Sequence, residues 1–247
     1  MAKKYVILDT ETTGTDENDR IIQLGYIVLG EKVPEVQNEF FSSVVPISFH
    51  AMEVHGITPE MIKGKTTCQE SNSYKRLLEL NTPDNYMIIH NAPFDLGMLE
   101  KEGFKAQMKI IDTLRVAKHI FADEDAHRLQ YFRYKMELYK DEQKEADALG
   151  IEVKAHDAIG DVLVLKLFLS KLKEAVQKQF PNENPVEKMV DLTNTPITIT
   201  TFKFGKYKGK TLKEVASSDA GYLRWMLSGM ENLDEDMRYS INNVLMG

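Results

Sequence analysis

Short aliphatic runs that end in polar or acidic residues recur along the first half of the chain, and they constrain its fold most strongly. The run Lys4–Asp9 is compact and aliphatic, which is typical of a buried strand. Arg20–Gly30 and Val36–Val45 are further strand candidates, and the short links between these three favour antiparallel neighbours. Tyr86–His90 and Lys109–Asp112 are strand candidates that alternate with helical segments. The pattern predicts an α/β fold, with a mixed β-sheet flanked by helices.

The segments between and after these strands have helical character. We expect helices within 49–80 and over Phe94–Glu102, Thr113–Phe121, His127–Leu149 and Asp157–Phe180. The polar segment Phe180–Pro185 contains two prolines, which cannot continue a helix. We therefore expect one large domain over 1–178, a linker over 179–198 and a small lysine-rich C-terminal α+β module over 199–247.

Size and composition exclude several protein classes. The chain has 247 residues, 43% hydrophobic and 28% charged, so it can bury a sizeable core without disulfide or metal staples. Its single cysteine, Cys68, excludes an internal disulfide and fits a reducing compartment. No apolar run has the length of a signal peptide or a membrane span, so we expect a cytoplasmic protein without a membrane partner. Because the net charge is −7, any contact with nucleic acid must be local.

Asp9 and Glu11 are the first candidate functional residues. They stand two positions apart at the end of an apolar strand, so their side chains share one face, about 6.6 Å apart along the chain. Two carboxylates at this spacing repel each other unless a cation lies between them, and Mg²⁺ and Mn²⁺ prefer carboxylate oxygens. The pair is therefore either a metal site or two solvated acids at a strand end.

Asp95 is a third candidate carboxylate. It follows the apolar run Tyr86–Ile89, and Pro93 suits the first turn of a helix that begins there. An acid in a first turn interacts favourably with the helix dipole, which alone would explain Asp95. The other interpretation is that this strand end lies beside the strand of Asp9 and adds a third carboxylate to its site.

His156 and Asp161 complete the candidate set. Five positions on one continuous helix would separate them by about 140°, away from a common face. They can converge if His156 lies in the preceding loop and the helix begins near Asp157, a good N-cap residue. Asp161 would then point inward one turn along the helix. Taken alone, His156 is better explained as a surface or structural histidine.

The combined motifs are more specific than any one of them. D-x-E, N-x-x-F-D and H-x-x-x-x-D follow in this order, with V-H-G-I-T at 54–58 between the first two. The set resembles the DEDDh branch of the 3′–5′ exonucleases, a DnaQ-like family with a ribonuclease H-like fold, and the resemblance extends to about residue 175. The five matched catalytic positions are Asp9, Glu11, Asp95, His156 and Asp161.

The resemblance implies a mechanism and a set of residue roles. The four carboxylates would bind two divalent cations, Mg²⁺ or Mn²⁺, and His156 would be the general base that deprotonates the attacking water. The product would be a 5′-mononucleotide released from a DNA 3′ end, in repair or end trimming. Family members contact the terminal nucleotide at positions that correspond here to Thr12, Thr13, Gly14, His55 and Phe94. For Phe94, core packing is the alternative explanation.

The C-terminal segment extends the resemblance. Residues 200–210, followed by 221–225, are similar to the C-terminal segment of bacterial exodeoxyribonucleases of the X type. Five lysines occur within 201–213 without an acid, so this segment is predicted to hold the DNA strand upstream of the cleaved end. The alternative is a protein partner bound through Tyr222, Arg224 and Trp225. The sequence departs from the family mainly in a charged insert over 123–150.

Other functions remain open at this stage. The same chemistry would serve a polymerase proofreading subunit or an RNA 3′-trimming exonuclease. A non-catalytic nucleic-acid-binding module with the same fold is a third alternative. The four carboxylates disfavour that module, because they would repel the ligand it binds.

Overall fold

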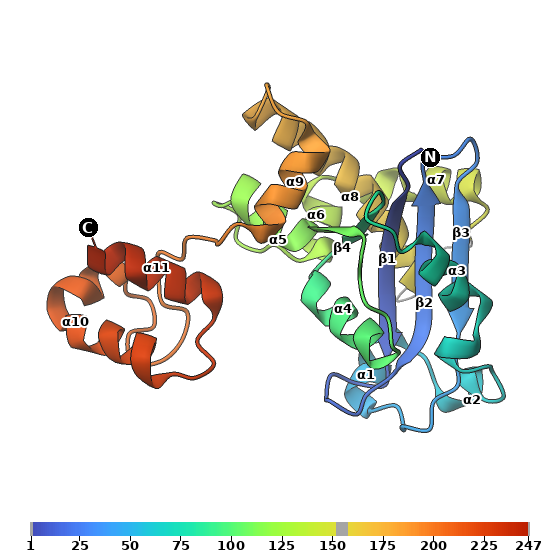
Figure 1. Ribbon diagram of the computed structural model, residues 1–247, viewed down its shortest axis with the longest axis horizontal. Coiled ribbons are helices and arrows are strands. Elements are labelled where there is room, and N and C mark those ends of the chain that lie inside the picture. Colours follow the sequence, from blue (N-terminus) through green and yellow to red (C-terminus); the bar gives the residue numbers. More distant parts are fainter. Residues whose placement is uncertain (1, 152–157, 247) are drawn as a thin grey trace. The chain divides into compact units, whose positions relative to one another are not determined.

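A mixed β-sheet forms the centre of residues 1–193, the first of two units into which the chain divides (Figure 1). The computed structural model describes residues 2–151 and 158–246. The spatial order of the five strands is β3-β2-β1-β4-β5. Their bounds are β1 Tyr5–Thr12, β2 Ile21–Leu29, β3 Glu35–Phe40, β4 Tyr86–Ile89 and β5 Lys109–Asp112.

The strand pairing confirms the predicted mixed sheet. β1 pairs antiparallel with β2, and β2 antiparallel with β3, across short connections. β4 pairs in parallel with β1, where Ile88 lies opposite Ile7, and β5 pairs in parallel with β4. Helical segments provide the crossovers that parallel strands need: α1 Phe49–His55, α2 Pro59–Ile62, η1 Cys68–Glu70, α3 Asn72–Leu80 and α4 Ala92–Lys101.

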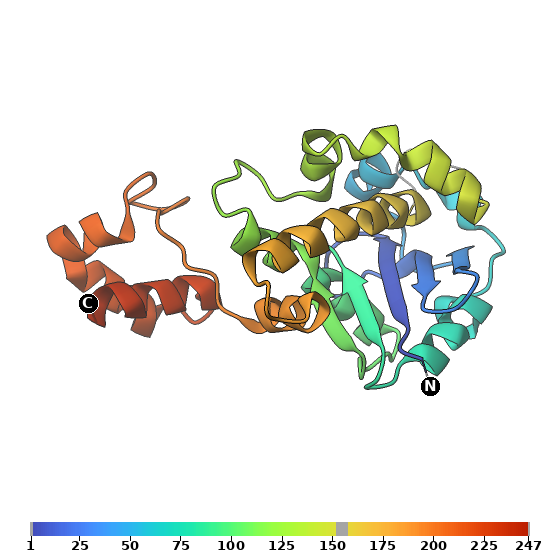
Figure 2. The ribbon, with the colours of Figure 1, turned by 90° about the horizontal axis from the view of Figure 1, so that it is seen from above.

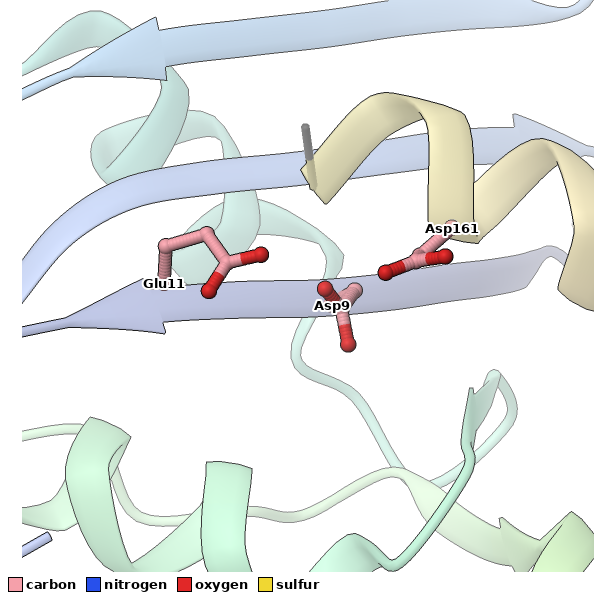
Figure 3. A group of neighbouring side chains, drawn as sticks. All are labelled: Asp9, Glu11 and Asp161. Atoms are coloured by element: carbon pink, nitrogen blue, oxygen red, sulfur yellow. The ribbon is translucent and has the colours of Figure 1, made fainter. Parts of the chain in front are cut away.

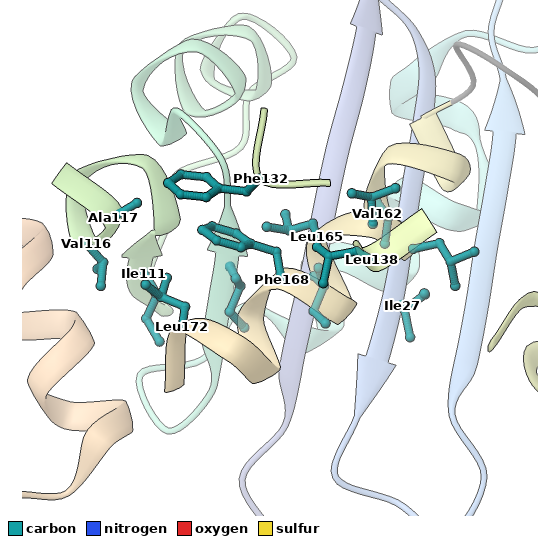
Figure 4. Packing of buried hydrophobic residues seen from close by; sticks show 14 of the residues in the cluster. Ile27, Ile111, Val116, Ala117, Phe132, Leu138, Val162, Leu165, Phe168 and Leu172 are labelled. Carbon is teal, nitrogen blue, oxygen red and sulfur yellow. The ribbon is translucent and has the colours of Figure 1, made fainter. Parts of the chain in front are cut away.

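Each face of the sheet carries its own hydrophobic core, because successive strand residues point to opposite faces. Ile7 lies in a core with residues of α8 (Ala158–Gln179), whereas Val6 and Leu8 lie in a second core with residues of α3 and α4. Figure 2 shows α8 running along one face of the sheet, and Figure 4 shows Phe132, Val162 and Phe168 within the core that it covers. The odd-numbered residues of β1 therefore face α8.

The segment between β5 and α8 differs from the long helix expected over His127–Leu149. After α5 (Thr113–Ile120) it forms α6 (Leu129–Lys135), the short η2 (Leu138–Lys140) and α7 (Glu142–Leu149). The break occurs at Glu137, which adopts a left-handed conformation with φ 56°. It turns the buried side chain of Leu138 into the core beneath α8. The expectation of one helix was wrong because the insert folds back onto α8.

The linker expected over 179–198 also needs correction. It contains α9 (Pro185–Asn194), whose Met189 and Leu192 are buried in the core that α8 covers. α8 ends at Gln179, before the two prolines, as predicted, but Pro185 is the first residue of a new helix. At that position its missing N–H costs no hydrogen bond.

We expect Glu187→Gln to weaken the attachment of α9 in a pH-dependent way. Glu187 accepts hydrogen bonds from Tyr86 and Lys109, which hold its pKa at about 2. A carboxylate whose pKa is lowered in the folded state stabilises the protein at pH values above its ordinary pKa. This contribution is lost as the pH falls toward 2. Because 42% of the side chain is exposed, we expect at most about 1 kcal/mol, or 2–4 °C in Tm, at pH 7.

Thermal melts of both proteins between pH 7 and pH 2.5 would measure this difference. Glu174→Gln is the matched control, because its carboxylate is 73% exposed and lies 4.0 Å from Lys171. A difference between wild type and Glu187→Gln that stays constant down to pH 2.5 would contradict the assigned role.

Residues 194–247 form the second unit, which contains α10 (Leu212–Gly229) and α11 (Glu235–Met246). Both helices contribute to a core of their own around Phe202, Leu223 and Ile241. In the described part of this unit, strand structure is limited to one antiparallel bridge between Thr201 and Thr211. Across the described residues of both units, none of the helices has the length and apolar character that crossing a membrane requires.

Candidate active site

β1 presents Asp9 and Glu11 to the face of the sheet that α8 covers. Ile7 is packed on this side, and the two-residue period of the strand places Asp9 and Glu11 on the same side. A β-bulge follows Glu11, where the register with β2 shifts before Thr12. The carboxylates therefore stand where the regular pairing of β1 ends.

Asp161 comes from the first turn of α8, and β2 sets the position of that turn. Gly25 lies opposite Asp9 in the sheet, and a Cβ atom built on it would lie only 2.8 Å from the backbone nitrogen of Ile159. The fully buried Gln23 accepts a hydrogen bond from the Ala158 backbone N–H at 3.4 Å. A glycine and a glutamine on β2 thus allow the start of α8 to approach the sheet.

Asp9, Glu11 and Asp161 form one acidic cluster. Each offers a carboxylate oxygen, and these oxygens all lie within 4.8 Å of one another (Figure 3). Burial, followed by the negative charges of Asp95, Glu11 and Asp161, raises the pKa of Asp9 well above its usual value. Such repulsion is relieved when a cation binds among the oxygens, and an all-oxygen donor set suits a hard divalent cation. The cluster therefore fits a divalent-metal site.

Asp95 lies outside this trio but acts on it. It is buried in the first turn of α4, where one carboxylate oxygen accepts hydrogen bonds from the backbone N–H and the hydroxyl of Thr10, at 3.0 and 2.7 Å. Burial raises the pKa of Asp95 to about 7, although the bonds from Thr10 oppose the shift. Both interpretations of Asp95 thus have structural support: it occupies a helix first turn, and its charge acts on Asp9.

The predicted base, His156, lies outside the described residues, as does the predicted cap, Asp157. The described part of α8 begins at Ala158 and carries Asp161 as the acid of its first turn. The position of Asp161 is therefore part of the observed site, whereas the role of His156 stays a prediction.

The predicted substrate residues after β1 form a tightly bonded turn. Thr12 donates its hydroxyl to the carbonyl of Gly14 at 2.7 Å, and Thr13 donates to Asp19 at 2.6 Å. A Cβ atom on Gly14 would lie 2.6 Å from an Asp19 carboxylate oxygen, so a larger residue would displace a carboxylate that Thr13 and the Asp16 backbone N–H hold in place. These residues shape the backbone beside Glu11, and their contact with substrate stays a prediction.

His55 and Phe94 are also held in place by the protein. The Nδ1 atom of His55 accepts from the Ile57 backbone N–H at 2.9 Å, which leaves Nε2 to donate to the carbonyl of Thr12 at 3.1 Å. Both ring nitrogens are thus bonded within the protein, and Nε2 joins the end of α1 to the end of β1. Phe94 is partly buried against the core of α3 and α4. Substrate contacts of both residues stay predictions.

Sequence reasoning did not identify Gln130, which lies in the charged insert. Its side-chain amide on α6 donates to a carboxylate oxygen of Asp161 at 2.7 Å. Arg133, one turn along α6, donates to Gln130 at 3.3 Å and pairs with Glu142 of α7. The insert therefore touches the acidic cluster. A glutamine in a helix gives no sequence signal of such a contact.

Known proteins resemble this chain along nearly its whole length. The model of the family described as Exonuclease matches residues 6–169, and that described as Exodeoxyribonuclease X-like C-terminal matches residues 202–229. Exodeoxyribonuclease 10 of Escherichia coli (strain K12) is 26% identical over 242 residues, which cover 97% of each chain. The DNA polymerase III subunit epsilon of Rickettsia prowazekii (strain Madrid E) is 33% identical over 132 residues, covering 48% of this chain and 56% of that one.

Solved structures show the same fold. Exonuclease X in complex with 5′ overhanging duplex DNA superposes with a TM-score of 0.54 and 18% identity, covering 76% of this chain and 99% of that one. Escherichia coli exonuclease I in complex with a dT13 oligonucleotide gives a TM-score of 0.52 and 19% identity, covering 72% and 42%. These likenesses confirm the ribonuclease H-like architecture that the sequence motifs implied.

Proposed function

Since the chain belongs to the exonuclease family matched over residues 6–169, and is therefore a nuclease, we propose that it hydrolyses DNA from 3′ ends to 5′-mononucleotides. The observation that carries the proposal is the acidic cluster, in which Asp9, Glu11 and Asp161 lie within 4.8 Å of one another. DNA repair or end trimming in the cytoplasm is the setting we propose, and the buried free thiol of Cys68 suits that reducing compartment.

We assign the roles in the reaction as follows. Asp9, Glu11 and Asp161, with support from Asp95, would hold two divalent cations, Mg²⁺ or Mn²⁺. Bound cations neutralise charge on the scissile phosphate and lower the pKa of an attacking water. His156 would accept the proton of that water, because an ordinary imidazole pKa of about 6.5 lies near the operating pH. Burial raises the pKa of Asp95 to about 7, and a cation bound nearby would favour its charged form.

The turn after β1 would hold the terminal nucleotide. Thr12, Thr13 and Gly14 form a fixed backbone turn beside Glu11, and His55 secures α1 against the same turn. Phe94 lies in the first turn of α4, directly before Asp95, so a base stacked on its ring would lie near the acidic cluster. The small residues of the turn would let the sugar and phosphate approach the backbone closely.

A polymerase proofreading subunit is the second candidate function. It is favoured by the 33% identity to the Rickettsia prowazekii epsilon subunit, although that match covers only 48% of this chain. Exodeoxyribonuclease 10 is similar over 97% of the chain, which includes the C-terminal segment. We therefore prefer an independent exodeoxyribonuclease to a proofreading subunit, and DNA to RNA.

Product analysis tests the proposal. The chain would be incubated with 5′-labelled single-stranded, blunt-ended and 3′-overhanging DNA, and with RNA of the same sequence, with Mg²⁺ or with EDTA. We expect a ladder of progressively shorter labelled DNA strands with Mg²⁺, 5′-mononucleotides as the other product, and no reaction in EDTA. Release of the 5′ label as the first product, or internal cleavage, would refute the proposed polarity. Faster digestion of RNA would reassign the substrate.

A further inference from the structure

The second unit carries a basic loop, residues 201–211, whose base is fixed by backbone hydrogen bonds. Thr201 and Thr211 form an antiparallel bridge, and the Phe202 backbone N–H donates to the carbonyl of Lys210 at 2.9 Å. Gly209 donates back to Phe202 at 2.8 Å, and Phe202 anchors the loop in the core with 2% exposure. Gly209 has a φ of 87°, which lets the chain turn between the two ends of the loop.

This basic loop concentrates positive charge in a chain whose net charge is −7. Lys203, Lys206, Lys208 and Lys210 are all exposed, and no acidic residue lies among them. Lys206 approaches Asp219 at 3.4 Å and is partly neutralised. For the other three, the described residues provide no salt bridge. Within the described chain Lys203 and Lys208 have no acidic partner, and Lys210 forms no salt bridge although its charge acts on Glu214.

Aromatic rings lie next to these lysines. Tyr207 meets Tyr222 of α10 edge to face at 5.0 Å, and Tyr222 lies 5.7 Å from Trp225 at a tilt of 35°. The Nζ atom of Lys206 lies 4.8 Å from the centre of the Tyr207 ring. Trp225 is 54% exposed and Phe204 is 49% exposed, so both rings present apolar surface to solvent.

Gly229 allows the Trp225 ring to lie along the surface of its own helix, α10. A Cβ atom on Gly229 would lie 2.8 Å from Nε1 of Trp225, so the indole lies close along α10 over the glycine. The ring is therefore held against its own helix while more than half of its surface faces solvent. Phosphates are attracted by lysines without acidic partners, and exposed aromatic faces stack on unpaired bases of any sequence.

We propose that the basic loop and the adjacent rings of Phe204 and Trp225 form a second binding site, which takes single-stranded nucleic acid. The lysines would contact the sugar–phosphate backbone, and the exposed rings would stack on bases. An acidic peptide would satisfy the lysines but not the aromatic faces, so nucleic acid is the better fit. The identification of the bound strand as DNA rests on the proposed function. The lysines and the exposed rings indicate single-stranded nucleic acid independently of that function.

The only tryptophan of the chain, Trp225, is a reporter within this site. Full-length protein would be titrated with (dT)20 in EDTA, which prevents hydrolysis, while tryptophan emission is recorded. We expect saturable quenching. K203A/K208A/K210A should weaken binding by about ten-fold at low salt and reduce the slope of log K against log[salt] by about 2, since each single-strand phosphate contact contributes about 0.7. Trp225→Ala, measured by anisotropy of labelled (dT)20, should also weaken binding by about ten-fold.

The control K171A/K173A/K178A removes three exposed lysines of α8 and should leave binding and slope unchanged. Unchanged emission on adding (dT)20, or an unchanged slope in K203A/K208A/K210A, would overturn the proposal. Quenching by poly-glutamate but not by (dT)20 would instead indicate an acidic protein partner. Mg²⁺-dependent digestion of DNA is scored separately, so failure of this site and failure of the proposed exonuclease activity remain distinguishable.

Discussion

Replacing Asp9 by asparagine is expected to lower Mg²⁺-dependent nucleotide release by at least about 10³-fold, while the protein remains folded. Asparagine keeps the size of the side chain but removes the charge at the centre of the acidic cluster. Bound metal contributes several kcal/mol to stabilising the charge of the transition state, and each 1.36 kcal/mol changes the rate tenfold. Timed release of 5′-mononucleotides from a single strand would measure the loss.

The same substitution is expected to stabilise the metal-free protein. Burial and the neighbouring acids raise the pKa of Asp9, so folding favours its protonated form. A group with a raised pKa in the fold stabilises it at low pH and loses that contribution as the pH rises through the folded pKa. In EDTA, the Tm of Asp9→Asn should therefore exceed that of wild type increasingly as the pH rises. Adding Mg²⁺ should raise the Tm of wild type more than that of the variant.

Asp84→Asn provides the control for both measurements. Asp84 is exposed in the turn before β4, and its substitution removes one carboxylate without altering the acidic cluster. It should change neither the rate nor the response of Tm to Mg²⁺. An Asp9→Asn protein that keeps a tenth or more of wild-type activity would rule out the proposed metal site. A variant that unfolds in EDTA would show that Asp9 is needed for folding instead.

The features that could be predicted from sequence depend on local periodicity. The run before Asp9 has the composition of a buried strand, and the two-residue period places Asp9 and Glu11 on one face without knowledge of the rest of the chain. Pro93 before Asp95 likewise marks a helix start, which the structure confirms. The proximity of Asp161 to Asp9 required the motif resemblance, because nothing local to either residue relates a strand to a helix so distant in sequence.

The features that could not be predicted depend on contacts between distant segments. α6 ends at Lys135, and the left-handed residue Glu137 after it directs Leu138 into the core beneath α8, which is assembled from the whole sheet. Pro185 could be interpreted as a break, but only burial of Met189 and Leu192 shows that a helix follows it. Gln130 and Gly25 have no special local pattern, and their importance comes only from their distance to the start of α8.

Gly25 provides the most direct test of how the protein positions Asp161. Gly25→Ala would place a methyl group 2.8 Å from the backbone nitrogen of Ile159 and 2.9 Å from the carbonyl carbon of Ala158, both in the first turn of α8. Backbone atoms cannot rotate away, so this turn must shift by about 0.6 Å to restore an ordinary contact. Asp161 shares the turn and would move away from Asp9 and Glu11.

A displacement of this kind is expected to lower kcat by about 10- to 100-fold and to raise the Mg²⁺ concentration needed for half-maximal activity. KM should change less, because the turn after β1 is not displaced. Gly97→Ala is the matched control: Gly97 lies within α4, nothing lies within 4 Å of the added methyl group, and we expect unchanged kcat with unchanged or slightly higher Tm. Assays at temperatures well below the Tm of both variants exclude unfolding as the cause of a lower kcat, so any loss reports the displaced first turn of α8. Normal kcat and normal Mg²⁺ dependence in Gly25→Ala would show that the close approach of α8 to β2 does not position Asp161.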